Sequence, residues 1–296
     1  MPLHATTPLN VAPDERAVAE YALAVLARCR YVTRSSFLAA MGPLGLRQDL
    51  IDGWLKAEVL YQGSVLLDPL KAEETPYLAL TRSGARALAS ATGVHVEGRT
   101  LTQLKRRCQT RSHDVCTGEL ALSILTLAKD GMIDLVGVET DDRRLAFSTV
   151  IAEPDQAPEQ MTLRPDGMVA VKSAMGTVAF LIETDRGTIQ PKTMQRRYRG
   201  YLAWARDGGP FRDFSIKALR VLTVVPTEAR KRALMQAALE ANRNNPSGFL
   251  LFALQDHLTI DRAEWWLGPV AYALGTTPEG RVKLLPEREW IRPAPD

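Results

Sequence analysis

Apolar residues in the first hundred positions recur at spacings of three and four, the pattern of amphipathic helices. Four segments show it: 14–26, 33–41, 46–57 and 82–91. Between the last two lie two short apolar strands, 65–67 and 77–80, around a proline-bearing loop. Three helices, a two-stranded wing and a further helix are typical of a winged helix-turn-helix. The pattern therefore predicts a DNA-binding domain of this kind at 13–95, after a flexible arm at 1–12.

The third helix of such a domain enters the major groove. We expect DNA contacts from the polar residues on and near it: Arg34, Arg47, Gln48 and Lys56. Asp49 and Asp52 share the exposed face of the helix, which makes that face mixed in charge. A winged helix that serves only protein contacts or dimerisation is the alternative.

The second half of the chain alternates strands with helices. Helices are predicted from 113 to about 130, over 190–206 and over 227–242, and strands at 133–138, 145–148, 218–225 and 249–254, with one more near the end. Residues 152–160 are predicted to be a loop, and 163–186 a β-hairpin. This order predicts a mixed α/β domain over 113–296, with helices on both faces of a mixed sheet.

Basic residues are concentrated in two stretches that contain no acid, although the net charge is only +3. The first follows Glu97 in a predicted basic linker, 96–112, and supplies Lys105, Arg106, Arg107 and Arg111. The second follows the hairpin and supplies Arg186, Lys192 and Arg196. Bases at this density can neutralise DNA phosphates. A solvated linker or surface helix is the alternative.

Three carboxylates flank the predicted hairpin. Asp166 precedes its first strand, and Glu183 and Asp185 end its second, so we expect all three at one edge of the sheet. Oxygen ligands of this kind suit Mg²⁺ or Mn²⁺, which would activate a water beside a phosphodiester. Glu119 is a candidate fourth acid, and Lys172, Lys192 and Arg197 are candidate bases or electrostatic clamps. The alternative is a turn aspartate and ordinary salt bridges.

Residues 164–167 (RPDG) and 180–188 (FLIETDRGT), followed by a helix containing Tyr201, resemble the replication-relaxation family. The His113-Asp114 pair and the N-terminal winged helix extend the resemblance over about 14–255. It implies a second domain similar to the PD-(D/E)xK nucleases, in which Asp166 and Glu183 bind the metal. Asp185 stands at the position where that motif has its lysine. In relatives a lysine in the following helix takes over, and the resemblance assigns that position to Arg197, which stays protonated and cannot serve as a base.

We therefore expect a DNA-binding protein of a plasmid or mobile element, acting on double-stranded DNA in replication or transfer, with a nuclease-like domain that nicks DNA with Mg²⁺ or Mn²⁺. One alternative is a transcription regulator whose nuclease-like domain is inactive and serves in DNA contact or dimerisation, in which case a homodimer is expected. Another is a protein-interaction adaptor. Three cysteines without disulfide-like spacing, no signal-peptide pattern and no long apolar run predict a cytoplasmic protein without membrane contact.

Overall fold

The chain forms two compact units, Thr7–Thr126 and Leu127–Asp296, which are described separately. The computed structural model describes residues 15–67, 73–93, 95–96, 98–105, 111–140, 143–152, 157–173, 176–267, 271–274 and 281–282. The predicted arm at 1–12 lies outside these residues. None of the helices that they form is both long and apolar enough to cross a lipid bilayer.

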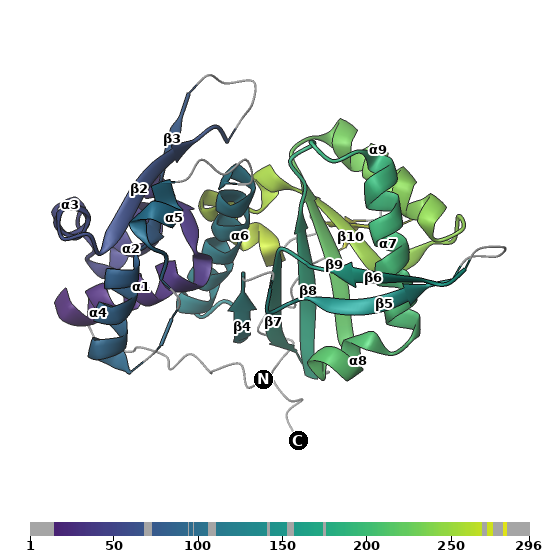
Figure 1. Cartoon of the computed structure of the whole chain (residues 1–296), viewed down its shortest axis with the longest axis horizontal. Coiled ribbons are helices and arrows are strands. Elements are labelled where there is room, and N and C mark those ends of the chain that lie inside the picture. Colours follow the sequence, from purple (N-terminus) through teal and green to yellow (C-terminus); the bar gives the residue numbers. More distant parts are fainter. Residues whose placement is uncertain are drawn as a thin grey trace. The chain divides into compact units, whose positions relative to one another are not determined.

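The N-terminal unit consists of helices around a small antiparallel sheet (Figure 1). Its helices are α1 (Glu15–Cys29), α2 (Arg34–Met41), α3 (Gln48–Lys56), α4 (Arg82–Thr92), α5 (Leu101–Lys105) and most of α6 (Arg111–Lys129). Its strands are β1 (Tyr31–Thr33), β2 (Leu60–Val65) and β3 (Thr75–Leu80). The strand order is β1-β3-β2, so the first strand pairs with the last. The four helices predicted here are all present.

Local capping explains where these helices begin. The Thr33 hydroxyl accepts a hydrogen bond from Ser36 N at the start of α2, and Thr81 caps α4 through Gly84 N in the same way. The first of the two strands predicted between the third and fourth helices was placed too late in the chain. It covers 60–65, because that segment pairs in register with 75–80, whereas Leu66 is 47% exposed. Strand β1 was not predicted, since three residues carry no detectable alternation.

Helices α5 and α6 pack into the N-terminal unit. Leu104 of α5 and Val115 of α6 are buried in one apolar cluster with Tyr31, Val65 and Tyr77. The compact units therefore divide within α6, after Thr126, and not at the predicted residue 113. Part of the predicted linker is therefore helical, with Leu104 buried, and its residues 106–110 lie outside the described part of the chain.

The C-terminal unit is built on a mixed sheet with the strand order β12-β11-β10-β9-β8-β7-β4. These strands are β4 (Leu135–Glu139), β7 (Gly167–Ser173), β8 (Gly176–Thr184), β9 (Ala218–Val225), β10 (Ser247–Leu254), β11 (Ala271–Leu274) and β12 (Arg281–Val282). Strands β8, β9 and β10 are mutually parallel, and β7 and β8 form the predicted antiparallel hairpin. The predicted mixed α/β fold is confirmed.

Helices α7 (Pro191–Arg206) and α9 (Glu228–Ala241) lie together along this sheet (Figure 1). Both contribute to one core cluster, with Leu181 and Val221 from the sheet. Phe180 and Leu222 point the other way and are also buried. The central strands are therefore buried on both faces, which explains their near-continuous apolar sequence.

Strand β6 and helix α8 of this unit are among the elements that were not predicted. Strand β6 (Glu159–Leu163) pairs with β5 (Phe147–Ile151) in a separate two-stranded sheet, although its start was assigned to a loop. Met161 and Leu163 are its only apolar residues, which is too short an alternation to predict a strand, and only Leu163 is buried. Helix α8 (Gly209–Phe214) is too short to show a helical period.

Candidate functional site

Asp166 and the end of strand β8 lie at the same edge of the sheet. Gly167 pairs with Ile182 in the hairpin register, which places Asp166 beside the last residues of β8. The Asp166 backbone N–H donates to Ile182 O at 2.9 Å, and its carboxylate Oδ2 accepts from Thr184 N at 2.8 Å. The hairpin therefore brings the three predicted carboxylates to one edge, as expected from the strand periodicity.

Glu183 is buried between two side chains of helix α7. Only 2% of the residue is exposed, yet its Oε1 lies 2.9 Å from Arg197 Nη2 and accepts a hydrogen bond from the Tyr201 hydroxyl. Arg197 also donates to Arg164 O. Burial opposes the charge on Arg197, but Glu183 and the other nearby acid, Asp166, raise its pKa above the ordinary value. Arg197 is therefore a permanent cation inside this site.

Asp185 is equally buried and is paired with Arg230 of helix α9. Arg230 Nε lies 2.6 Å from Asp185 Oδ2, and Nη2 lies 2.9 Å from Oδ1, so the pair is bidentate. Arg230 also donates to Ile189 O, and Gly187 N donates to Asp185 Oδ2 at 3.1 Å. Hydrogen bonding to Asp185 raises the pKa of Arg230.

Arg230 was missed in the sequence, although a signal for it exists. Strands β8 and β9 are parallel, so their carboxyl ends meet at one edge, and Asp185 N donates to Val224 O at 2.8 Å. Thr227 caps α9 immediately after β9. The first turn of that helix must therefore lie near Asp185, and Arg230 is the third residue of the helix.

The donor atoms at this edge do not fit a divalent metal ion. Mg²⁺ needs carboxylate oxygens that converge on a common position and keeps several waters. Here one Glu183 oxygen is occupied by Arg197 and Tyr201, and both Asp185 oxygens are occupied by Arg230. Within the described residues, no group of three or more His, Cys, Asp or Glu side chains is arranged to hold a metal. The two guanidinium groups supply the positive charge that an ion would bring.

Two other residues predicted to belong to this site, Glu119 and Lys172, lie away from it. Glu119 lies on α6 in the part that belongs to the N-terminal unit, and its Oε1 accepts from Thr33 N at 2.6 Å. Lys172 is exposed and pairs with Thr177 beside the hairpin turn, at the opposite end of β7 from Asp166.

Two of the predicted DNA-binding arginines of the N-terminal unit, Arg34 and Arg47, are paired with acids. Arg34 contacts Asp52 and donates to Gln62 Oε1 at 2.7 Å, which ties α2 to α3 and β2. Arg47 is exposed but lies 2.8 Å from Glu15 and 3.1 Å from Asp49. These contacts position the start of α3 and reduce its free positive charge.

The other residues of this unit that were predicted to contact DNA differ in exposure. Gln48 and Lys56 of α3 and Lys105 of α5 are exposed. Arg111 is buried, with its guanidinium 4.2 Å from the ring centre of Tyr31. Arg106 and Arg107 lie outside the described residues.

In the C-terminal unit, helix α7 carries a basic stripe in which Lys192 and Arg196 are exposed and Arg199 is half-buried. Lys192, Arg196 and Arg199 line a cavity of about 220 Å³ beside β5 and β6. Arg196 pairs with Glu159 of β6, and Arg186, between β8 and α7, is half-buried. The predicted contacts Lys192 and Arg196 thus share one face, and Arg199 extends it by one helical turn.

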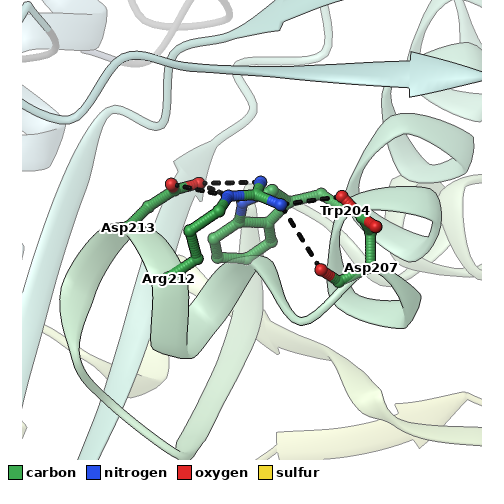
Figure 2. Close-up of polar contacts among 4 residues, drawn as sticks. All are labelled: Trp204, Asp207, Arg212 and Asp213. Atoms are coloured by element: carbon green, nitrogen blue, oxygen red, sulfur yellow. Dashed lines mark hydrogen bonds and ion pairs between the residues drawn. The ribbon is translucent and has the colours of Figure 1, made fainter.

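A larger groove, of about 1010 Å³, runs between strand β5 and helix α8. Figure 2 shows the Arg212 guanidinium held between Asp213 and Asp207, at 3.0 and 2.7 Å, with Asp213 also bonded to Trp204 Nε1. Arg212 is therefore neutralised by its own neighbours. The groove offers no excess positive charge from this arginine to a nucleic acid.

A model of the replication-relaxation family matches residues 61–214, just over half of the chain. The chain belongs to the replication-relaxation family. Comparisons with curated proteins and with solved structures give no match. The matched span includes Asp166, Glu183, Asp185 and Arg197 and ends before Arg230. Membership of the replication-relaxation family supports a role in the replication or relaxation of mobile elements.

Proposed function

We propose that this replication-relaxation protein binds double-stranded DNA of a plasmid or other mobile element and acts in its replication or transfer. The topology of the N-terminal unit carries the proposal. Its elements follow the order helix, strand, helix, helix, strand, strand, and β1 pairs with β3 beside β2. This order supports a winged helix, in which α3 is the helix that enters the major groove.

The exposed polar residues of helix α3 support this role. Ile51 is its one fully buried residue among the nine of the helix, and Gln48 and Lys56 point outward. Arg34 and Arg47 are held by acids, and the Gln48 amide oxygen accepts from the Arg34 guanidinium. We therefore assign DNA contact on this helix first to Lys56, with the neighbouring Gln48 as a second contact. On the other unit, Lys192 and Arg199 of the basic stripe of α7 are a second phosphate-binding candidate, whereas Arg196 between them is paired with Glu159.

Replacing Lys56 with glutamine is expected to weaken duplex binding several-fold and by the same factor for specific and random duplexes. A lysine that contacts phosphate also changes the salt dependence: the slope of log K against log [salt] should fall in magnitude by about 0.9. Fluorescence anisotropy over a salt series measures both quantities. Lys217→Gln, an equal charge change at an exposed residue outside these surfaces, is the control. Equal affinities and slopes for Lys56→Gln and Lys217→Gln would remove α3 from the DNA interface.

We further propose that the second unit is a nuclease-like scaffold without divalent-metal chemistry. The support is the pairing of Glu183 with Arg197 and of Asp185 with Arg230, since each arginine occupies carboxylate oxygens that a metal would need. Neither arginine can act as a base near neutral pH. This favours the interpretation in which the unit contributes DNA contact or assembly and not strand cleavage.

Supercoiled DNA incubated with the protein and Mg²⁺ or Mn²⁺ is therefore expected to remain supercoiled. The rate of nicking should equal that of Asp166→Ala, which removes a carboxylate but leaves both arginine pairs. Agarose gel electrophoresis of the plasmid over time gives the measurement. Metal-dependent nicking by the unmodified protein that Asp166→Ala abolishes would overturn the proposal and restore the nuclease hypothesis.

A further inference from the structure

Among the described residues of the N-terminal unit, the buried hydroxyl of Tyr31 and the buried Nη1 of Arg111 have no hydrogen-bond partner. Tyr31 is 1% exposed and Arg111 is 6% exposed. An unsatisfied buried polar group costs about 1–3 kcal/mol, and more when it is charged. Such groups are rare in native proteins, and an ion or a water commonly explains them.

Positive charge is also concentrated at this place. The guanidinium of Arg111 lies 4.2 Å from the centre of the Tyr31 ring, and that of Arg99 lies 5.0 Å from it. Burial lowers the pKa of Arg99, and the nearby charges of Arg30 and Arg111 lower it further. The acid beside them is Asp114, whose Oδ2 is 3.7 Å from Arg111 Nη1, too far for a hydrogen bond.

The backbone around these side chains is fixed. Arg99 O accepts from Arg82 N at 2.8 Å, and Thr81 pairs with Arg99 in an isolated bridge. A Cβ on Gly98 would lie 2.3 Å from Thr81 O, so this segment is pressed against the start of α4. Tyr31 is held in β1, and Arg111 opens helix α6. The three side chains are therefore presented by anchored elements and not by a loose loop.

We propose that Tyr31, Arg99 and Arg111 form a binding site for a phosphate oxyanion. A phosphate accepts hydrogen bonds from a tyrosine hydroxyl and from guanidinium N–H groups, and it neutralises the excess charge. A water would satisfy the hydrogen bonds but not the charge. The phosphate belongs either to a DNA backbone or to a small phosphorylated molecule. The inference does not depend on the proposed function, because it can be tested with inorganic phosphate and no DNA.

Thermal unfolding of the full chain in increasing sodium phosphate, with sodium chloride at matched ionic strength as reference, tests the site. Phosphate stabilises proteins generally by exclusion from their surface, so the expected signal is a saturable rise in Tm that depends on the named residues. Arg99→Gln should abolish the saturable part. Arg86→Gln, an exposed arginine of α4, should keep it.

The Tyr31→Phe substitution should raise the stability of the free protein and lower its affinity for phosphate. Without phosphate the variant should unfold at a Tm about 2–8 °C higher, because an unsatisfied hydroxyl is removed. Its phosphate affinity should be about tenfold lower, because one hydrogen bond to the anion is lost. The same gain in Tm at every phosphate concentration, or no saturable effect in the unmodified protein, would overturn the proposal.

Duplex binding by Tyr31→Phe then identifies the source of the phosphate. Weaker DNA binding than that of the unmodified protein assigns the site to a backbone phosphate. Unchanged DNA binding together with lost phosphate binding assigns it to a small phosphorylated molecule. Both results uphold the anion site, and absence of phosphate binding rejects it even if the protein binds DNA through α3.

Discussion

Replacing Arg230 with alanine is expected to lower the free energy of unfolding of the C-terminal unit by about 3–5 kcal/mol. The substitution removes a bidentate partner from Asp185, whose side chain is 1% exposed. Without the arginine, no cation offsets the desolvation cost of the buried Asp185 carboxylate. Ile189 O loses a donor at the same time.

Urea-induced unfolding followed by circular dichroism measures this change. The matched control is Arg196→Ala, which removes an arginine from an ion pair whose side chains are 57% and 52% exposed in the same unit. That variant should lose at most about 1 kcal/mol. Similar small losses in both variants would mean that Asp185 is not held by Arg230, and the argument against a metal at this edge would fail with it.

The pairing of Asp185 with Arg230 also shows which features of the site could be predicted from the sequence. The hairpin, the Thr33 cap and the acids at the strand ends were predictable, because strand periodicity and capping are local. The place of Arg230 depends on the parallel pairing of β8 with β9, which is not local. Arg197 was visible in the sequence as a counter-charge but Arg230 was not, so the carboxylate cluster favoured a metal.

The residues that we expect to contact DNA divide in the same way, into features with a local cause and features that depend on distant parts of the chain. Exposure of Gln48 and Lys56 follows from the helical period of α3, with Ile51 inward. The pairing of Arg47 with Glu15 connects residues 32 positions apart. Arg111 is buried because α6 packs on β1. In the sequence it stands in a run of basic residues, so it was predicted to be an exposed DNA contact.

Alanine in place of glycine at position 118 is expected to destabilise the N-terminal unit by about 3 kcal/mol or more. A Cβ there would lie 1.7 Å from Tyr31 O and 2.7 Å from Cys29 O. Both are backbone atoms that cannot rotate away, so α6 would have to move off β1 and disturb the contacts of Val115. Overpacking costs about 1–3 kcal/mol and more where the backbone must shift.

Gly53→Ala provides the matched control for this prediction. Gly53 is an exposed position inside α3, and a Cβ there would meet nothing within 4 Å. The same substitution should therefore stabilise the unit, by about 0.5–1 kcal/mol, through helix propensity. Urea unfolding of both variants should give shifts of opposite sign. If Gly118→Ala were neutral, α6 would not be packed against β1, and the division of the chain after Thr126 would give way to the boundary at 113 expected from the sequence.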